Sequence, residues 1–381
     1  MTLRARSLVL ATVVVALAGA CSSGSKSARS PSTSRATSRA SAADAPSTST
    51  TAPFNGDVYA FTKAGMLSPA VAGITTRVYV PNSESNTLDI IDPTTYTVIA
   101  HYGVGALPQH VTPSWDLRTL YVDNDKGNSL TPIDPRTGAL GTPIPVDDPY
   151  NLYFTPDGTK AIVVAERLQR LDFRDPHTWK LIKSVHIPHT GADHLDFTVD
   201  GNELVVSCEF SGWLVRVDVR TMSITGELRV GGQPIDVKLS PDGQSMYVAN
   251  QSRNGVSVID PARMIETAFI PTGGGAHGLY PSRDGKLLYV SNRTVGSISV
   301  IEFATNHVVA TWNIGGTPDM GGVSADGRQL WLSGRYSGSV YVIDTTTGRL
   351  LHTIPVGAGP HGLDIFPQPG RYSIGHTGNY R

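Results

Sequence analysis

Residues Gly275–Gly316 read GAHGLYPSRDGKLLYVSNRTVGSISVIEFATNHVVATWNIGG, and the chain then starts again with TPDMGGVSADGRQLWLSGR. Four short runs make up the longer stretch: HGLYPS, KLLYVSN, SISVIEF and HVVATWNI. They are rich in Val, Ile, Leu and Tyr, and Gly, Asp and Asn separate them. Such runs predict strands joined by turns, and none has the spacing of an amphipathic helix. The stretch therefore predicts one four-stranded antiparallel unit.

The same unit recurs along most of the chain. One marker is the aspartate in the turn before the second strand, at Asp116, Asp157, Asp200, Asp242, Asp284 and Asp326. These residues follow one another at intervals of 41, 43, 42, 42 and 42. A second marker ends the third strand, at Asp92, Asp134, Asp172, Asp218, Asp260, Glu302 and Asp344. A period of this length indicates an array of similar supersecondary units.

Burial of both sheet faces decides how the units pack. In the run KLLYV, Leu287 and Tyr289 point to one face, and Leu288 and Val290 point to the other. A sheet with one face in water would show polar residues on that face. Each sheet must therefore be covered on both sides, and stacking around a common axis, as in a β-propeller, achieves this.

The two ends of the repeat region predict a closed ring. The first complete strand, at Arg77, has no strand before it, and PHGLDIFPQPG at 360–370 has no strand after it. The C-terminal strand therefore fits the vacant place in the N-terminal blade. We predict an all-β, seven-bladed propeller of four-stranded antiparallel blades within 57–381. Residues 57–76 and 371–381 lie outside the repeat.

The N-terminus predicts export. Arg4 and Arg6 precede an apolar run, so residues 1–20 are interpreted as a signal peptide. The end of that segment, Ala18-Gly19-Ala20-Cys21, resembles a bacterial lipobox, which implies lipidation of Cys21 and anchoring to the outer side of the cell membrane. The alternative is an ordinary signal peptide followed by a chance cysteine. Residues 21–56, rich in Ser, Thr and Ala, are expected to form a disordered tether.

Charge and cysteine content narrow the classes of partner and fold. The formal net charge is −1, which gives no argument for nucleic-acid binding. Cys208 is the one cysteine besides Cys21. If Cys21 carries a lipid, no disulfide within the chain is available, so Cys208 is expected to be a small buried apolar residue. We expect a monomeric fold that depends on its hydrophobic core alone.

Several second strands carry a recognisable motif. The runs RVYVPN, LYVDN, MYVANQ and LYVSNR, together with VSVIDP and IPVG, resemble the YVTN-type β-propeller repeat family from Arg77 to about Pro367. The third position of the tetrapeptide departs from the family name, with Pro81, Asp123, Ala249 and Ser291. The resemblance implies an extracytoplasmic propeller. It implies no single chemistry, because one fold hosts many functions.

Aligned repeats predict a polar mouth at one end of the central channel. The start of each first strand and the loop after each second strand should meet there. The candidate ligand-binding residues at these positions are His110, His194, His277, His361, Glu166, Glu209, Asp193, Asp319, Arg167, Arg293 and Arg335.

Three interpretations of this mouth remain open. In the first, the polar side chains only bond one another and the loop backbones. In the second, Arg and His bind a small organic anion or an envelope protein, since Arg takes carboxylates bidentately. In the third, the mouth is an enzyme site of lactonase or lyase type, with a divalent metal held by His194, His277, His361 and Glu209.

Overall fold

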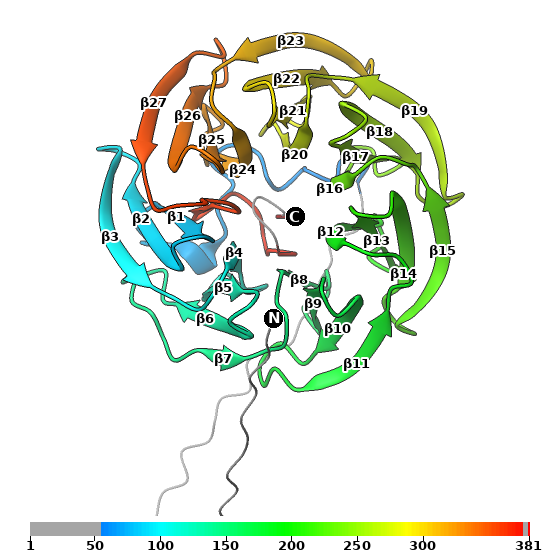
Figure 1. Cartoon of the computed structure of the whole chain (residues 1–381), viewed down its shortest axis with the longest axis horizontal. Helices are drawn as coiled ribbons and strands as arrows, with labels where there is room; N and C mark the ends of the chain where they lie inside the picture. The colour runs from blue at the N-terminus through cyan, green and yellow to red at the C-terminus, as the bar shows by residue number, and fades with distance from the viewer. Residues whose placement is uncertain (1–54, 376–379) are drawn as a thin grey trace, which may run out of the picture. The chain divides into compact units, whose positions relative to one another are not determined.

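Seven four-stranded sheets form a closed ring in the computed structural model, which describes residues 55–375 and 380–381 (Figure 1). The expected signal peptide, Cys21 and most of the tether lie outside the described residues. One short 3-10 helix, η1 (Pro69–Val71), accompanies the strands. No helix in the described part has the length and apolar character needed to span a bilayer. The predicted seven-bladed, all-β propeller is confirmed.

Each blade is one antiparallel sheet, and its strands are given below in order from the innermost to the outermost. Blade 1 comprises β28 (Asp364–Phe366), β1 (Arg77–Asn82), β2 (Thr87–Asp92) and β3 (Thr97–Gly103). Blade 2 comprises β4 (Pro108–Pro113), β5 (Leu120–Asn124), β6 (Ser129–Ile133) and β7 (Ile144–Pro145). Blade 3 comprises β8 (Asn151–Phe154), β9 (Ala161–Ala165), β10 (Arg170–Arg174) and β11 (Leu181–His186). Blade 4 comprises β12 (Ala192–Phe197), β13 (Glu203–Cys208), β14 (Trp213–Asp218) and β15 (Ser223–Arg229).

The other three blades follow the same order. Blade 5 comprises β16 (Pro234–Leu239), β17 (Met246–Asn250), β18 (Gly255–Asp260) and β19 (Ile265–Pro271). Blade 6 comprises β20 (Ala276–Pro281), β21 (Leu287–Asn292), β22 (Ser297–Glu302) and β23 (His307–Asn313). Blade 7 comprises β24 (Pro318–Val323), β25 (Gln329–Gly334), β26 (Ser339–Asp344) and β27 (Leu350–Pro355).

The ring closes through blade 1. Strand β28 pairs antiparallel with β1, so that Val78 lies opposite Ile365 and Tyr79 opposite Asp364. The last strand of the repeat region thus occupies the innermost place in the first blade, as predicted. Closure pairs the edges that an open sheet array would expose.

The hydrophobic core lies between neighbouring blades. In β21, Leu288 and Val290 pack with Tyr247 of blade 5. Tyr289, on the opposite face of the same strand, packs with Leu330 of blade 7. Both faces of the strand are therefore buried, which confirms the prediction from the run KLLYV. Cys208 is also buried and free.

The recurrent Asp-Gly turn has a local cause. In blade 5, the Ser240 hydroxyl donates to Asp242 at 2.5 Å, and the backbone N–H of Gln244 donates to the same carboxylate oxygen at 3.0 Å. Gly243 has φ 70°, a conformation that glycine adopts without steric cost. The aspartate thus orders the turn, and the glycine completes it.

The terminal segments cover the end of the channel opposite the histidines. Near the N-terminus, the Tyr59 hydroxyl donates to the carbonyl of Leu239, the last residue of β16, at 2.6 Å. Near the C-terminus, Arg381 Nη2 donates to Asp196 at 2.7 Å and to the carbonyl of Phe197 at 3.2 Å. Figure 1 shows the C-terminus inside the ring. The segments outside the repeat therefore pack on the far end of the ring.

Candidate ligand-binding site at the channel mouth

A recurrent break in strand pairing positions the mouth residues. In five blades the register of the innermost strand shifts at its second and third residues. The residues at these breaks are Gln109 and His110, Asp193 and His194, Ile235 and Asp236, His277 and Gly278, and Asp319 and Met320. A bulge bends its strand and re-aims side chains. The second and third residues of these five innermost strands are therefore released from regular pairing.

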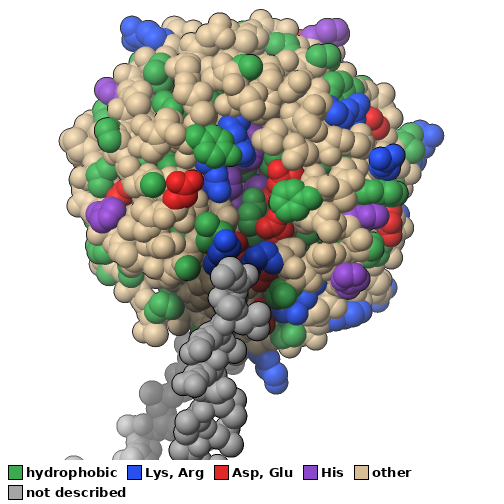
Figure 2. Space-filling view, viewed as in Figure 1, with side chains coloured by type: hydrophobic (Ala, Val, Ile, Leu, Met, Phe, Trp, Pro, Cys, Tyr) green, Lys and Arg blue, Asp and Glu red, His purple; other side chains and the backbone are tan. Residues whose placement is uncertain are grey.

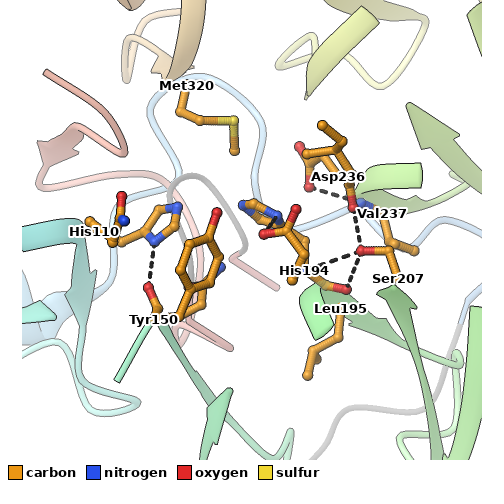
Figure 3. A network of polar contacts seen from close by, with 12 residues as sticks. His110, Tyr150, His194, Leu195, Ser207, Asp236, Val237 and Met320 are labelled. Atoms are coloured by element: carbon orange, nitrogen blue, oxygen red, sulfur yellow. Dashed lines mark hydrogen bonds and ion pairs between the residues drawn. The ribbon is translucent and has the colours of Figure 1, made fainter. Parts of the chain in front are cut away.

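Serines in the second strands hold these breaks in place. Ser207 Oγ accepts the backbone N–H of His194 at 3.1 Å and donates to the carbonyl of Ile235, in the next blade, at 2.5 Å (Figure 3). Ser291 Oγ likewise accepts from Gly278 and donates to the carbonyl of Asp319, both at 2.8 Å. Sequence reasoning noted the varied third position of the tetrapeptide but missed this role.

The four predicted histidines form a continuous row. The ring centroids of His194 and His110 lie 5.2 Å apart, those of His110 and His361 4.9 Å, and those of His361 and His277 6.0 Å. All four side chains are buried. In Figure 3, His110 and His194 point into the channel beside Tyr150. Residues more than 250 positions apart along the chain are thus brought together, with His110 and His361 in ring contact.

Each histidine turns Nδ1 toward an oxygen atom. His110 Nδ1 bonds the carbonyl of Tyr150 at 2.9 Å, and His361 Nδ1 bonds Asp319 Oδ2 at 2.8 Å. His277 Nδ1 lies 3.0 Å from Asp319 Oδ1, and His194 Nδ1 lies 2.7 Å from Asp193 Oδ1. A carbonyl or carboxylate oxygen only accepts, so the bonds at His110 and His361 assign the proton to Nδ1.

The histidines are neutral at neutral pH. Burial lowers the pKa of His194 and of His277 to about 4. Burial, followed by the Arg335 charge, holds the pKa of His361 well below its usual range. Burial and the neighbouring histidines do the same to the pKa of His110. The positive charge of the mouth therefore comes from its arginines.

Asp319 is the ionised centre of this row. Its carboxylate is fully buried, and Arg293 Nη2 lies 2.9 Å from Oδ1. Burial alone would raise the pKa of Asp319, but the Arg293 guanidinium, together with His277 and His361, holds it well below its usual range. Asp319 and Arg293 therefore neutralise one another within the wall of the mouth.

Three acids of the predicted mouth have raised pKa values. Burial, together with neighbouring carboxylates, raises the pKa of Glu166 to about 8 and that of Glu209 to about 8. Burial raises the pKa of Asp193 to about 7. At neutral pH the two glutamates are mostly uncharged and can donate hydrogen bonds.

The three predicted arginines have different environments. Arg167 Nε lies 2.6 Å from Asp148 and 3.2 Å from Asp125, and its side chain, 44% exposed, bridges blades 2 and 3 at the rim. Arg293 forms an ion pair with Asp319. Arg335 Nη1 contacts Gln109 Oε1 at 3.5 Å, and within the described residues no carboxylate lies within ion-pair distance of Arg335. Figure 2 shows basic, acidic and histidine side chains gathered around the central hollow of this face.

The asparagines after the second strands are structural. Asn82 Nδ2 donates to Thr87 and Asp89, Asn124 Nδ2 to Ser129 and Thr131, and Asn292 Nδ2 to Ser297 and Ser299. These bonds join the ends of the second and third strands of one blade.

The metal hypothesis receives no support from the geometry. Across residues 55–375, 380 and 381, no three or more His, Cys, Asp or Glu side chains are grouped so as to hold a metal ion. The proposed ligands His194, His277, His361 and Glu209 do not form such a group.

Comparisons with known proteins agree on the fold. A family model described as a YNCE-like beta-propeller matches residues 58–369. No curated protein matches the sequence. Hydrazine synthase from Kuenenia stuttgartiensis is similar in structure, with 21% identity, a TM-score of 0.58 and coverage of 66% of this chain and 87% of that chain.

Two further solved structures resemble this chain over nearly their full length. A putative 6-phosphogluconolactonase from Bacteroides uniformis has 17% identity and a TM-score of 0.62, and the match covers 76% of this chain and 99% of that chain. Apo AztD from Citrobacter koseri has 12% identity and a TM-score of 0.58, and covers 80% of this chain and 98% of that chain. At these identities the likeness shows the fold alone.

Proposed function

Because the chain belongs to the YNCE-like β-propeller family, a fold that supplies a rigid ring with a polar mouth, we propose that it is a binding protein for a carboxylate-bearing ligand. The carboxylate belongs either to a small organic anion or to an acidic loop of an envelope protein. The ligand enters the mouth formed by the loops after the second strands, where binding residues are commonly presented by a rigid scaffold.

The observation that carries this proposal is the environment of the Arg335 guanidinium. It is half-buried and lies close enough to the mouth for its charge to depress the pKa values of His361 and Glu209. Arg167 and Arg293 are each paired with aspartate, whereas among the described residues Arg335 has only a long contact with the Gln109 amide. A guanidinium without a carboxylate partner is suited to bidentate recognition of one on a ligand.

The surroundings of Arg335 favour an anion. The histidines are neutral, and Glu166 and Glu209 are mostly protonated at neutral pH, so no strong negative field opposes the ligand. The protonated glutamates supply further donors. As these groups ionise above their pKa, they would repel the same ligand.

Lipidation of Cys21 places the propeller outside the cell in this proposal. The basic and apolar N-terminal segment and its resemblance to a lipobox support export and anchoring. The mouth would then sample ligands or partners of the cell envelope.

Titration calorimetry with citrate and gluconate tests the proposal. Arg335→Gln should weaken binding by roughly tenfold or more, because a charge-assisted bidentate bond is lost. Arg118→Gln is the control, since Arg118 is 78% exposed in the turn before β5, at the other end of the blade, and it should leave the affinity unchanged. Capture of envelope proteins by wild type and by Arg335→Gln distinguishes a partner's acidic loop from a free anion. Equal behaviour of the two variants with every ligand would refute the role of Arg335.

The raised pKa values of three carboxyl groups in the mouth favour a second function. Three carboxyl groups, Glu166, Glu209 and Asp193, have pKa values of about 7 to 8, which suits proton transfer near neutral pH. A lactonase or lyase activity would use these groups. Hydrolysis of a sugar lactone by wild type but not by Glu209→Gln would favour catalysis over binding alone.

A further inference from the structure

A second depression lies on the mouth face and shares Arg293 with the channel mouth. Its volume is about 310 Å³, at the lower end of ligand-pocket sizes, and loops of blades 5, 6 and 7 form its walls. The residues around it are Gln233, Gln251, Ser252, Asn254, Gly275, Arg293, Thr294 and Tyr336. None of these is an acid or a lysine, and Asp319 neutralises the one arginine. The depression is therefore polar but uncharged, in contrast to the mouth.

Tyr336 gives this depression an aromatic surface. The side chain is 67% exposed. It is nevertheless oriented, because Arg293 Nη1 donates to its hydroxyl at 3.3 Å and the backbone N–H of Tyr336 donates to Thr317 Oγ1 at 3.1 Å. Arg293 is itself fixed by Asp319. An exposed aromatic ring held in one orientation can stack on the apolar face of a flat ligand at low entropic cost.

The opposite wall offers amides and hydroxyls. Gln251 Nε2 makes a long bond of 3.4 Å to Gln233 Oε1. Gln251 Oε1 is buried and, within the described residues, has no hydrogen-bond partner. A buried acceptor of this kind usually finds a donor in the functional state. A small turn of either amide would present donors and acceptors together to a ligand hydroxyl.

From this juxtaposition we propose that the depression binds a neutral saccharide of one or two rings. The ligand stacks one ring face on Tyr336 and directs hydroxyl groups to the Gln233–Gln251 amide pair and to Ser252 and Thr294. An acidic sugar is disfavoured because Arg293, the one cation in the wall, already has a carboxylate partner. This site is distinct from the anion site, because Arg335 does not line the depression.

Saturation-transfer NMR on the full-length protein tests the site, with cellobiose and N,N′-diacetylchitobiose as neutral probes and glucuronate as the charged comparison. Transfer to at least one neutral disaccharide is expected. Tyr336→Ala should weaken its binding roughly tenfold, because the stacking surface is lost. Tyr336→Phe should retain binding because it keeps the ring, and Gln251→Ala should weaken it.

Phe210→Ala provides the matched control, since Phe210 is a 63% exposed aromatic residue on the equivalent loop of blade 4, outside the depression. It should leave saccharide binding unchanged. Melting temperatures of all variants should match that of wild type, which separates lost contact from lost folding. Absence of transfer to both disaccharides, transfer to glucuronate alone, or binding insensitive to Tyr336→Ala would each overturn the proposal.

Discussion

His361 Nδ1 lies 2.8 Å from Asp319 Oδ2, and this contact joins blade 7 to the segment that enters blade 1. The other oxygen of the same carboxylate lies 3.0 Å from His277 and 2.9 Å from Arg293, both in blade 6. Three consecutive blades therefore meet at one buried aspartate. The mouth therefore contains a polar network around one ion pair, in addition to the hydrophobic packing between blades.

Replacing Asp319 should destabilise the fold strongly. Asp319→Asn leaves the Arg293 guanidinium buried without its counter-charge, a change that typically costs about 3–5 kcal/mol. Urea unfolding at pH 7 measures the difference. Asp147→Asn is the control, because Asp147 is 68% exposed and its contact with Arg170 is a surface ion pair, worth at most about 1 kcal/mol. Similar losses in both variants would contradict the role given to Asp319.

The protonated glutamates predict a distinct pH dependence of stability. The folded-state pKa of Glu209, about 8, exceeds its unfolded value, so its stabilising contribution is present at low pH and is lost as pH rises toward 8. In Glu209→Gln the side chain does not ionise, so this loss of folding stability does not occur. The variant should gain stability relative to wild type between pH 6 and pH 9, by about 1–2 kcal/mol once solvent screening is considered. Unfolding curves across this range provide the measurement, and a constant difference between the proteins would contradict it.

The same groups should control binding of the proposed anion. Affinity for citrate or gluconate should fall as pH rises through about 8, when Glu166 and Glu209 become charged. In the double variant Glu166→Gln/Glu209→Gln the dependence should be much weaker. Calorimetric titrations at several pH values test this, and an affinity that increases with pH in wild type would rule out the assigned geometry.

Arg381 should stabilise the far end of the channel. It is buried and paired with Asp196, which is buried as well, although the two lie 185 positions apart in the chain. Arg381→Ala is expected to cost about 3 kcal/mol or more, since it strands the partner charge. Amide exchange at residues 371–375 should accelerate in this variant. A free energy of unfolding and amide exchange rates equal to those of wild type would contradict this role of Arg381.

Cys21 should retain the protein at the membrane. Under the proposed lipidation, Cys21→Ala removes the acylated thiol and should release the propeller into the medium, because anchoring depends on the acyl chains. Fractionation of cells expressing each form measures this. Ser22→Ala, at the adjacent residue, is the control and should leave the distribution of the protein between membrane and medium unchanged.

Much of the fold could be predicted because its signal is local and repeated. Leu288 and Tyr289, on opposite faces of one strand, are both apolar, and that pattern alone requires a sheet covered on two sides. The surplus strand at the C-terminus then predicts closure. The covering of the far end could not be predicted, since Tyr59 and Arg381 act through single long-range contacts that no repeat encodes.

The position of the site residues was also largely predictable, whereas their partners were not. Equivalent positions of a ring repeat reach the same end of the channel, so His110 and His361 could be expected to meet. Arg167 and Arg335 occupy comparable loops, yet Asp125 and Asp148 of the adjoining blade engage only Arg167. Such differences depend on which side chain the neighbouring blade happens to present, and a single sequence does not reveal this.

The terminal segments that cover the far end also attach both ends of the described chain to the ring. Tyr59 bonds the last residue of β16, and Arg381 bonds the end of β12, so each segment is anchored on an innermost strand. Loss of the Arg381 anchor would therefore expose neighbouring side chains such as Tyr380, which is almost wholly shielded from solvent.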